Sequence, residues 1–378
     1  MAAQPVTSNP SLYLAISYHG FGHIAQTAPV VNELAQRFPD LHVWVQCAAP
    51  REVLEPHFHG EFEHIPEAPD IGMVMGSSLD VSVDESYAAH AAFHHTWDER
   101  VANLSERLRT LRPSLVLANV PYLSCAAAAK AGIPSAALCS LNWAEIFQPY
   151  CGAMPEGEAI VRRIRSAYGE AELFLTPEPS MPMPGLANLR PIGPIARRGV
   201  NRRNEISERL GLKPDEKLVL LFMGGIHTVL ALAEWPVLQG TKFLVAGTDC
   251  PRRPDMFPLE SLGLPYIDIF CSVDALITKP GYGSVVDAAC NDVPLLYVKR
   301  HWPEEPFLVQ WLHAHGQCHE LSREDLECGH LEGALDALWR QSQKPPVTPT
   351  GTIEAADLLE SYLGTSDQVP SPSGRGLG

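Results

Sequence analysis

Residues 279–294 read Lys-Pro-Gly-Tyr-Gly-Ser-Val-Val-Asp-Ala-Ala-Cys-Asn-Asp-Val-Pro, and apolar runs lie on both sides of them. The runs at 274–278 and 295–298 are typical of buried parallel strands, and Ser284 to Asn291 predicts a helix between them. Glycines at 281 and 283 allow a positive φ and the close approach of a ligand. Because a helix that begins after such a turn presents free N–H groups, the stretch predicts a seat for a phosphate.

Carboxylates follow this turn at two places. Asp287 lies one turn into the predicted helix, and Glu304 and Glu305 follow the next strand. In doubly wound sheets ligands bind at the carboxyl ends of the strands, where these side chains could accept hydrogen bonds from sugar hydroxyls. The alternative is that the glycines only form a turn and that the carboxylates are solvated surface groups.

The first half of the chain contains a similar unit. An apolar run at 12–16 ends at Ser-Tyr-His-Gly-Phe-Gly-His (17–23), and apolar residues at helical spacing follow at 24–38. The loop lacks the third glycine of a dinucleotide-binding motif, which argues against NAD. It carries His19 and His23 instead, and a histidine that titrates near neutrality suits general base catalysis. Alternatively, His23 only holds the loop.

Apolar runs and helical segments alternate along the chain, as a parallel α/β sheet requires. We predict one long helix over 83–111 and a strand over 266–270. The strand at 218–222 runs into Gly224 and Gly225, a second candidate diphosphate loop. The proline-rich segment at 176–200 predicts a stiff crossing between two domains.

Taken together, the motifs Gly-Tyr-Gly-Ser-x-x-Asp-Ala, Val-Pro and Arg-x-x-x-Glu-Glu-Pro-Phe resemble the donor half of GT-B glycosyltransferases. The nearest likeness is to glycosyltransferase-like proteins related to the amino-terminal half of plant L-arabinokinase. The resemblance implies two Rossmann-like domains that face each other across a cleft. It implies a diphosphate at Gly281, Gly283 and Ser284, a ribose at Asp287, and a donor sugar at Glu304 and Glu305.

In the first domain the resemblance assigns the general base to the Gly-His pair at Gly22 and His23. The segment Ile-Pro-Ser (133–135) with Asn142 and Trp143 resembles another family motif, although it departs from the pattern by one residue, with Asn142 directly before the tryptophan. Trp143 is as consistent with core packing as with sugar stacking. Where relatives carry an aspartate after the preceding strand, this chain has Asn119. If that aspartate orients the histidine, Asn119 weakens the base.

Composition excludes several classes of partner. The formal net charge of −16 disfavours nucleic acid, and we find no apolar run near the length of a membrane span. Because residues 1–10 also lack the pattern of a signal peptide, we expect a cytoplasmic protein. Nine cysteines without a Cys-x-x-Cys pair indicate reduced thiols. No Asp-x-Asp motif is present, and we expect neither a metal ion nor a cofactor. The sequence leaves the oligomeric state open.

We therefore expect an α/β chain with an acceptor-side domain at 1–190, a donor domain at 191–350, a helix at 351–363 that packs back on the first domain, and a disordered tail at 364–378. The expected function is transfer of a sugar from a nucleotide-diphosphate donor, UDP-linked by preference, to an acceptor that the sequence does not identify. Two alternatives are a nucleotide-sugar-binding protein without activity, which Asn119 favours, and a nucleotide-sugar epimerase.

Overall fold

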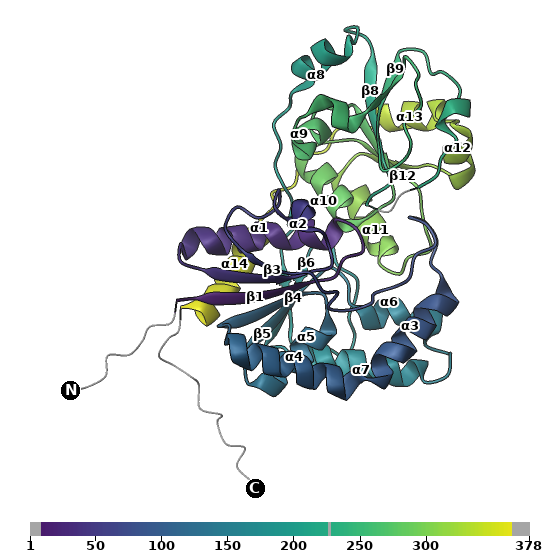
Figure 1. Cartoon of the computed structure of the whole chain (residues 1–378). Helices are drawn as coiled ribbons and strands as arrows, with labels where there is room; N and C mark the ends of the chain where they lie inside the picture. The colour runs from purple at the N-terminus through teal and green to yellow at the C-terminus, as the bar shows by residue number, and fades with distance from the viewer. Residues whose placement is uncertain (1–8, 226–227, 365–378) are drawn as a thin grey trace, which may run out of the picture.

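A computed structural model describes residues 9–225 and 228–364 of the chain. Two lobes, each built on a parallel sheet, lie one above the other (Figure 1). The predicted disorder of 365–378 concerns residues outside this described part.

The first sheet has the order β3-β2-β1-β4-β5-β6-β7, and every pair of neighbours is parallel. The interior strand β1 is buried at every position because helices cover both faces of the sheet. Pro191 lies in β7 at the edge of the sheet, where a missing N–H costs least. Among the described residues the strands are β1 (Ser11–Ile16), β2 (His42–Gln46), β3 (Glu63–Ile65), β4 (Leu115–Asn119), β5 (Ser135–Leu138), β6 (Leu173–Pro177) and β7 (Leu189–Ile192).

The helices of this domain are α1 (Gly22–Arg37), α2 (Arg51–Leu54), α3 (Val83–His95), α4 (Trp97–Leu111), α5 (Tyr122–Ala131), α6 (Trp143–Cys151) and α7 (Gly157–Gly169). The prediction of one helix over 83–111 was wrong, because the helix breaks at Thr96. The Thr96 hydroxyl donates to Phe93 O and accepts from Arg100 Nε, and such local bonds compete with helix continuation. α1 packs on one face of the sheet, and α4, α5 and α7 pack on the other (Figure 1).

The second sheet has the order β10-β9-β8-β11-β12-β13, again parallel throughout. Among the described residues its strands are β8 (Lys217–Phe222), β9 (Thr241–Ala246), β10 (Met256–Pro258), β11 (Ala275–Thr278), β12 (Leu295–Tyr297) and β13 (Cys318–Glu320). The helices of this domain are α8 (Arg203–Leu210), α9 (Tyr266–Phe270), α10 (Tyr282–Asn291), α11 (Glu305–His315), α12 (Arg323–Cys328) and α13 (Glu332–Trp339), with short 3₁₀ turns at Leu232–Glu234 and Leu259–Leu262. The last helix of the described residues is α14 (Gly351–Leu363).

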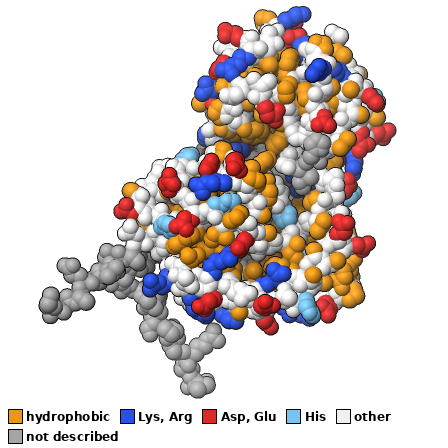
Figure 2. All heavy atoms as spheres, in the orientation of Figure 1, with side chains coloured by type: hydrophobic (Ala, Val, Ile, Leu, Met, Phe, Trp, Pro, Cys, Tyr) orange, Lys and Arg blue, Asp and Glu red, His pale blue; other side chains and the backbone are white. Residues whose placement is uncertain are grey.

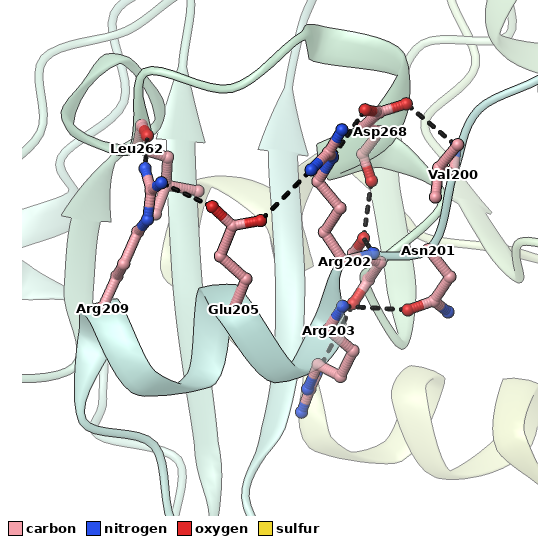
Figure 3. A network of polar contacts seen from close by, with 9 residues as sticks. Val200, Asn201, Arg202, Arg203, Glu205, Arg209, Leu262 and Asp268 are labelled. Atoms are coloured by element: carbon pink, nitrogen blue, oxygen red, sulfur yellow. Dashed lines mark hydrogen bonds and ion pairs between the residues drawn. The ribbon is translucent and has the colours of Figure 1, made fainter.

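The strand predicted at 266–270 is the helix α9. A five-residue apolar run does not distinguish a strand from a buried helical turn. As a helix, the segment directs Asp268 toward the chain that enters the second domain (Figure 3). There Asp268 accepts hydrogen bonds from the Val200 N–H at 2.9 Å and from Arg202 Nε at 2.7 Å. These bonds fix the entry segment onto the second domain.

The chain crosses between the lobes twice, because α14 returns to pack on α1 (Figure 1). Ala355, Ala356 and Leu359 of α14 are fully buried in the core beneath α1. The two crossings touch at a pair of glycines. A Cβ added to Gly351 would lie 2.0 Å from Gly193 O, so the backbones meet without room for side chains.

No helix within 9–225 and 228–364 is long and apolar enough to span a bilayer. On the face drawn in Figure 2, acidic and basic side chains are interspersed over both lobes.

Candidate functional site

A cavity of about 630 Å³ opens between the two domains. Its walls are the carboxyl ends of strands from both sheets and the loops that follow them, the edge at which doubly wound sheets bind ligands. The predicted site residues that line it are His19, Gly22, His23, Trp143, Gly224, Gly225, Gly281, Gly283, Ser284, Asp287 and Glu304.

Two glycine loops, one from each domain, meet at this cavity. A Cβ added to Gly225 would lie 3.0 Å from the Cα of Gly20 and 3.0 Å from the ring of Phe21. Gly20 and Gly224 both have φ of +94°, which L side chains rarely adopt. The loops after β1 and β8 therefore approach each other only because they carry glycine.

His23 lies at the start of α1, with its ring against the carboxyl end of β4. Its Nδ1 is 2.8 Å from Asn119 Oδ1, while Asn119 Nδ2 donates to Gln26 Oε1 at 3.0 Å. An amide oriented in this way offers only its oxygen to the imidazole, so Nδ1 carries the hydrogen and Nε2 is left as the basic nitrogen. Asn119 is fully buried behind His23 and does not line the cavity itself.

Burial has the largest effect on the pKa of both histidines in the loop after β1, His19 and His23. It lowers the pKa of His23 to about 4, opposed by the Asn119 hydrogen bond and the charge of Asp70. It also lowers the pKa of His19 to about 4. The imidazole of His23 is therefore neutral at physiological pH, as a general base must be before it acts.

A hydrogen-bonded chain leads from His23 to the second domain. Asn119 bonds Gln26, Gln26 Nε2 donates to Ser140 Oγ at 3.3 Å, and Ser140 Oγ donates to Glu304 Oε1 at 2.6 Å. The carboxylate predicted to bind the donor sugar is thus connected to the predicted base through buried polar groups.

The phosphate seat differs from the prediction in detail. α10 begins at Tyr282 rather than Ser284, and neither Gly281 nor Gly283 has a positive φ. The positive φ that these glycines would allow is not used, because Gly281 is the extended N-cap, with φ of −88°, and Gly283 lies within the helix. A Cβ placed on Gly283 meets nothing within 4 Å, so packing does not require glycine there, and the residue lines the cavity.

Lys279 is a cavity residue that the sequence analysis missed. It follows β11 and packs beneath the other glycine loop, because a Cβ on Gly224 would lie 2.9 Å from Lys279 Cε. Burial and the charge of Arg300 lower the pKa of Lys279 to about 7, although Glu304 and Glu305 oppose this. A cation without an ion-pair partner among the described residues, beside a helix N-terminus, provides strong attraction for an anion.

The predicted sugar-binding carboxylates fall into different environments. Glu304 is buried at the cavity wall. Asp287 also lines the cavity, but its two oxygens accept from the backbone N–H and the guanidinium of Arg197, both at 3.0 Å. The structure does not bring Glu305 into the cavity, because Arg300 holds both of its oxygens.

Asn142 is likewise outside the cavity. Its side chain caps α6 by accepting from the Glu145 N–H at 3.0 Å, a common use of asparagine before a helix. Trp143 is consistent with both predicted roles, core packing and sugar stacking. It is only 1% exposed, and it lines the cavity. Its indole nitrogen donates to Asp70 Oδ2 at 2.6 Å. Asp70 is a second missed residue, and nothing in its loop sequence marks it.

Comparison with known proteins adds two kinds of likeness. No family model matches the chain. L-Arabinokinase of Arabidopsis thaliana is 28% identical over 340 residues, which are 87% of this chain and 32% of the plant protein, in its amino-terminal part. This chain therefore spans about a third of the length of that relative, and the likeness that the sequence motifs predicted is confirmed.

Solved structures decide the fold. The glycosyltransferase of kitacinnamycin superposes with a TM-score of 0.64 at 17% identity, over 94% of this chain and all of the other. The chain has the GT-B fold. A second GT-B neighbour, UGT71G1 of Medicago truncatula, was solved with UDP-glucose and gives a TM-score of 0.55 at 12% identity over 95% and 99% of the two chains. The predicted GT-B architecture is confirmed, while identities this low show the fold alone.

Proposed function

We propose that this GT-B chain is a glycosyltransferase that moves a sugar from a nucleotide-diphosphate donor to an acceptor hydroxyl, without a metal ion or a cofactor. The observation that carries the proposal is the shared cavity. It joins a neutral imidazole on one domain to a buried amine and a helix N-terminus on the other. We take UDP as the preferred nucleotide because a neighbour of the same fold was solved with UDP-glucose.

The proposed reaction is a direct displacement. Nε2 of His23 removes the proton of the acceptor hydroxyl as its oxygen attacks the anomeric carbon. The bond from that carbon to the diphosphate oxygen breaks, and the nucleoside diphosphate leaves with the electron pair. Lys279, the N–H groups that open α10 and the backbone at Gly225 stabilise the charge that develops on it.

The donor sugar is assigned to the wall at Glu304. This carboxylate keeps Oε2 for sugar hydroxyls while Ser140 occupies Oε1. Gly283 and Ser284 face the space next to it, and we assign the diphosphate to them. The remaining wall, with His19 and Trp143, is assigned to the acceptor.

A panel of UDP, GDP, dTDP and their sugars tests the proposal in two assays, thermal shift and donor hydrolysis. We expect UDP compounds to raise the melting temperature of the wild type and Gly283→Trp to abolish the shift. His23→Ala should keep the shift and lose hydrolysis.

Other outcomes separate the alternatives. Stabilisation by a nucleotide sugar without turnover in the wild type would identify a binding protein, the reading that Asn119 supports. Conversion of the donor to an epimeric sugar would identify an epimerase. Absence of any shift would contradict all three.

A further inference from the structure

Asp70 is a buried carboxylate to which the proposed reaction assigns no role. It lies in the loop between β3 and α3 and is 8% exposed. Its Oδ2 accepts from the Ser17 hydroxyl at the end of β1 and from Trp143 Nε1 at the start of α6. Two donors directed at one oxygen favour the ionised carboxylate, while burial raises the pKa of Asp70.

Trp143 connects this carboxylate to the loop histidines. The indole that donates to Asp70 has its ring centroid 5.9 Å from the ring of His23 and 5.2 Å from that of His19. Asp70 and His23 are also coupled by charge, since the carboxylate raises the pKa of His23 and the imidazole lowers the pKa of Asp70.

The other groups that face His23 bring no negative charge next to it. Asn119 is neutral, and burial raises the pKa of the Cys139 thiol, whose sulfur is 3.8 Å from Nδ1. His19 opposes protonation of His23. The charge of Glu304 helps to raise the pKa of Cys139, and its hydrogen-bonded connection to His23 runs through Ser140, Gln26 and Asn119.

A base that is buried needs a compensating charge when it takes a proton, because an unpaired imidazolium is strongly disfavoured away from water. The oxygen of Asn119 supplies a dipole but no charge. We propose that Asp70 is a positioning residue that holds Trp143 under the loop histidines and supplies the counter-charge for protonated His23, a role that the asparagine at 119 cannot fill. This inference rests on the proposed function for its catalytic meaning, but the charge relationship can be measured without turnover.

The direct test is an NMR titration of the His23 ring, identified among the 15 histidines by its loss in His23→Gln. Asn119→Asp puts a carboxylate on Nδ1 and brings the His23 pKa up into an accessible range. In this background we expect Asp70→Asn to lower the His23 pKa by about one unit, typical of losing a nearby opposite charge. Ser17→Ala, which removes one donor to Asp70 and no charge, should leave it nearly unchanged. Equal pKa values with and without Asp70→Asn would overturn the proposal.

A second measurement needs no variant of Asp70. The ¹³Cγ shift of Asp70 in the wild type reports its ionisation, and the proposal requires the carboxylate to be charged at pH 7.5. A protonated Asp70 at that pH would overturn the proposal even if Asp70→Asn failed to fold.

Turnover then links the charge to catalysis. We expect Asp70→Asn to lower kcat about tenfold or more with the donor KM unchanged, as for an interaction made only in the transition state. Asn119→Asp should restore most of that loss in the double variant. An unchanged kcat in Asp70→Asn overturns the catalytic part. If the wild type shows no turnover with any nucleotide sugar, the proposed function fails while the titrations still decide the charge relationship.

Discussion

Ser140 Oγ donates to Glu304 Oε1 at 2.6 Å, and the two residues belong to different domains. This bond closes the cavity wall between the lobes and ends the polar chain from His23. Glu304 is 3% exposed, so its carboxylate has little water to replace a lost partner. Substitution of Ser140 therefore tests directly how much this hydrogen bond between the domains contributes to stability.

Ser140→Ala should lower the free energy of unfolding by about 1–3 kcal/mol, because it leaves a buried carboxylate oxygen without its donor. Ser124→Ala is the matched control, since the buried Ser124 hydroxyl has no hydrogen-bond partner among the described residues. The control should change stability by less than about 0.5 kcal/mol. Urea denaturation of both variants checks this, and equal losses would contradict the importance of the Ser140 bond.

Gly283 and Gly333 are each the second residue of a helix, and a Cβ on either meets nothing within 4 Å. Alanine at each should therefore stabilise the free protein by about 0.5–1 kcal/mol through reduced backbone entropy. Only Gly283→Ala should weaken UDP binding, because its methyl group enters the cavity. Thermal shift with and without UDP compares the pair. Equal UDP affinity in both variants would contradict the assignment of the diphosphate site to the turn at Gly283.

Lys279→Met should raise the Kd for UDP by about tenfold or more, the loss expected for a charge-assisted bond. Because the pKa of Lys279 in the free protein is about 7, binding of the diphosphate anion above that pH should draw a proton onto the amine. Calorimetry in buffers of different ionisation enthalpy measures this uptake at pH 8. Lys130→Met, on the exposed end of α5, should change neither affinity nor uptake.

Glu305 predicts a pH dependence of stability. Burial raises its pKa from 4.5 to about 7, so the folded state holds its proton more tightly than the unfolded state. The stabilisation that protonated Glu305 contributes to folding is fully present below pH 4.5 and is lost as the pH rises through 7. Glu305→Gln mimics the protonated group, so its stability relative to the wild type should rise by about 1–2 kcal/mol between pH 5 and pH 8, after allowing for partial solvent screening. Denaturation at both pH values checks this. A difference in stability that stays the same at pH 5 and pH 8 would contradict it.

The alternation of apolar runs and glycine turns predicted both sheets, because parallel strands buried on both faces read as continuous apolar segments. The same pattern gave a wrong prediction at Tyr266–Phe270, because a short apolar run fits a strand or a helix equally well. It also missed the break between two helices at Thr96, which depends on a single side chain. His23 was predicted because it follows a glycine turn next to a strand, and the structure places it at the cavity.

The missed residues depend on contacts that sequence order does not contain. Asp70 becomes important only when Ser17 and Trp143 converge on it from distant segments. Lys279 belongs to the motif at 279–294, but its proposed role in attracting an anion depends on its burial next to Gly224, which the sequence does not show. The partners of Asp287 and Glu305, both arginines, are likewise set by packing between elements.

The contact between Gly193 and Gly351 has a mechanical consequence. Both connections between the lobes pass through this one point, where the backbones are too close for side chains. Any change in the angle between the lobes must bend both connections near this point. A Cβ on Gly351 would meet the Gly193 carbonyl oxygen at 2.0 Å, so a larger residue there must push the two connections apart and change the setting of one lobe against the other.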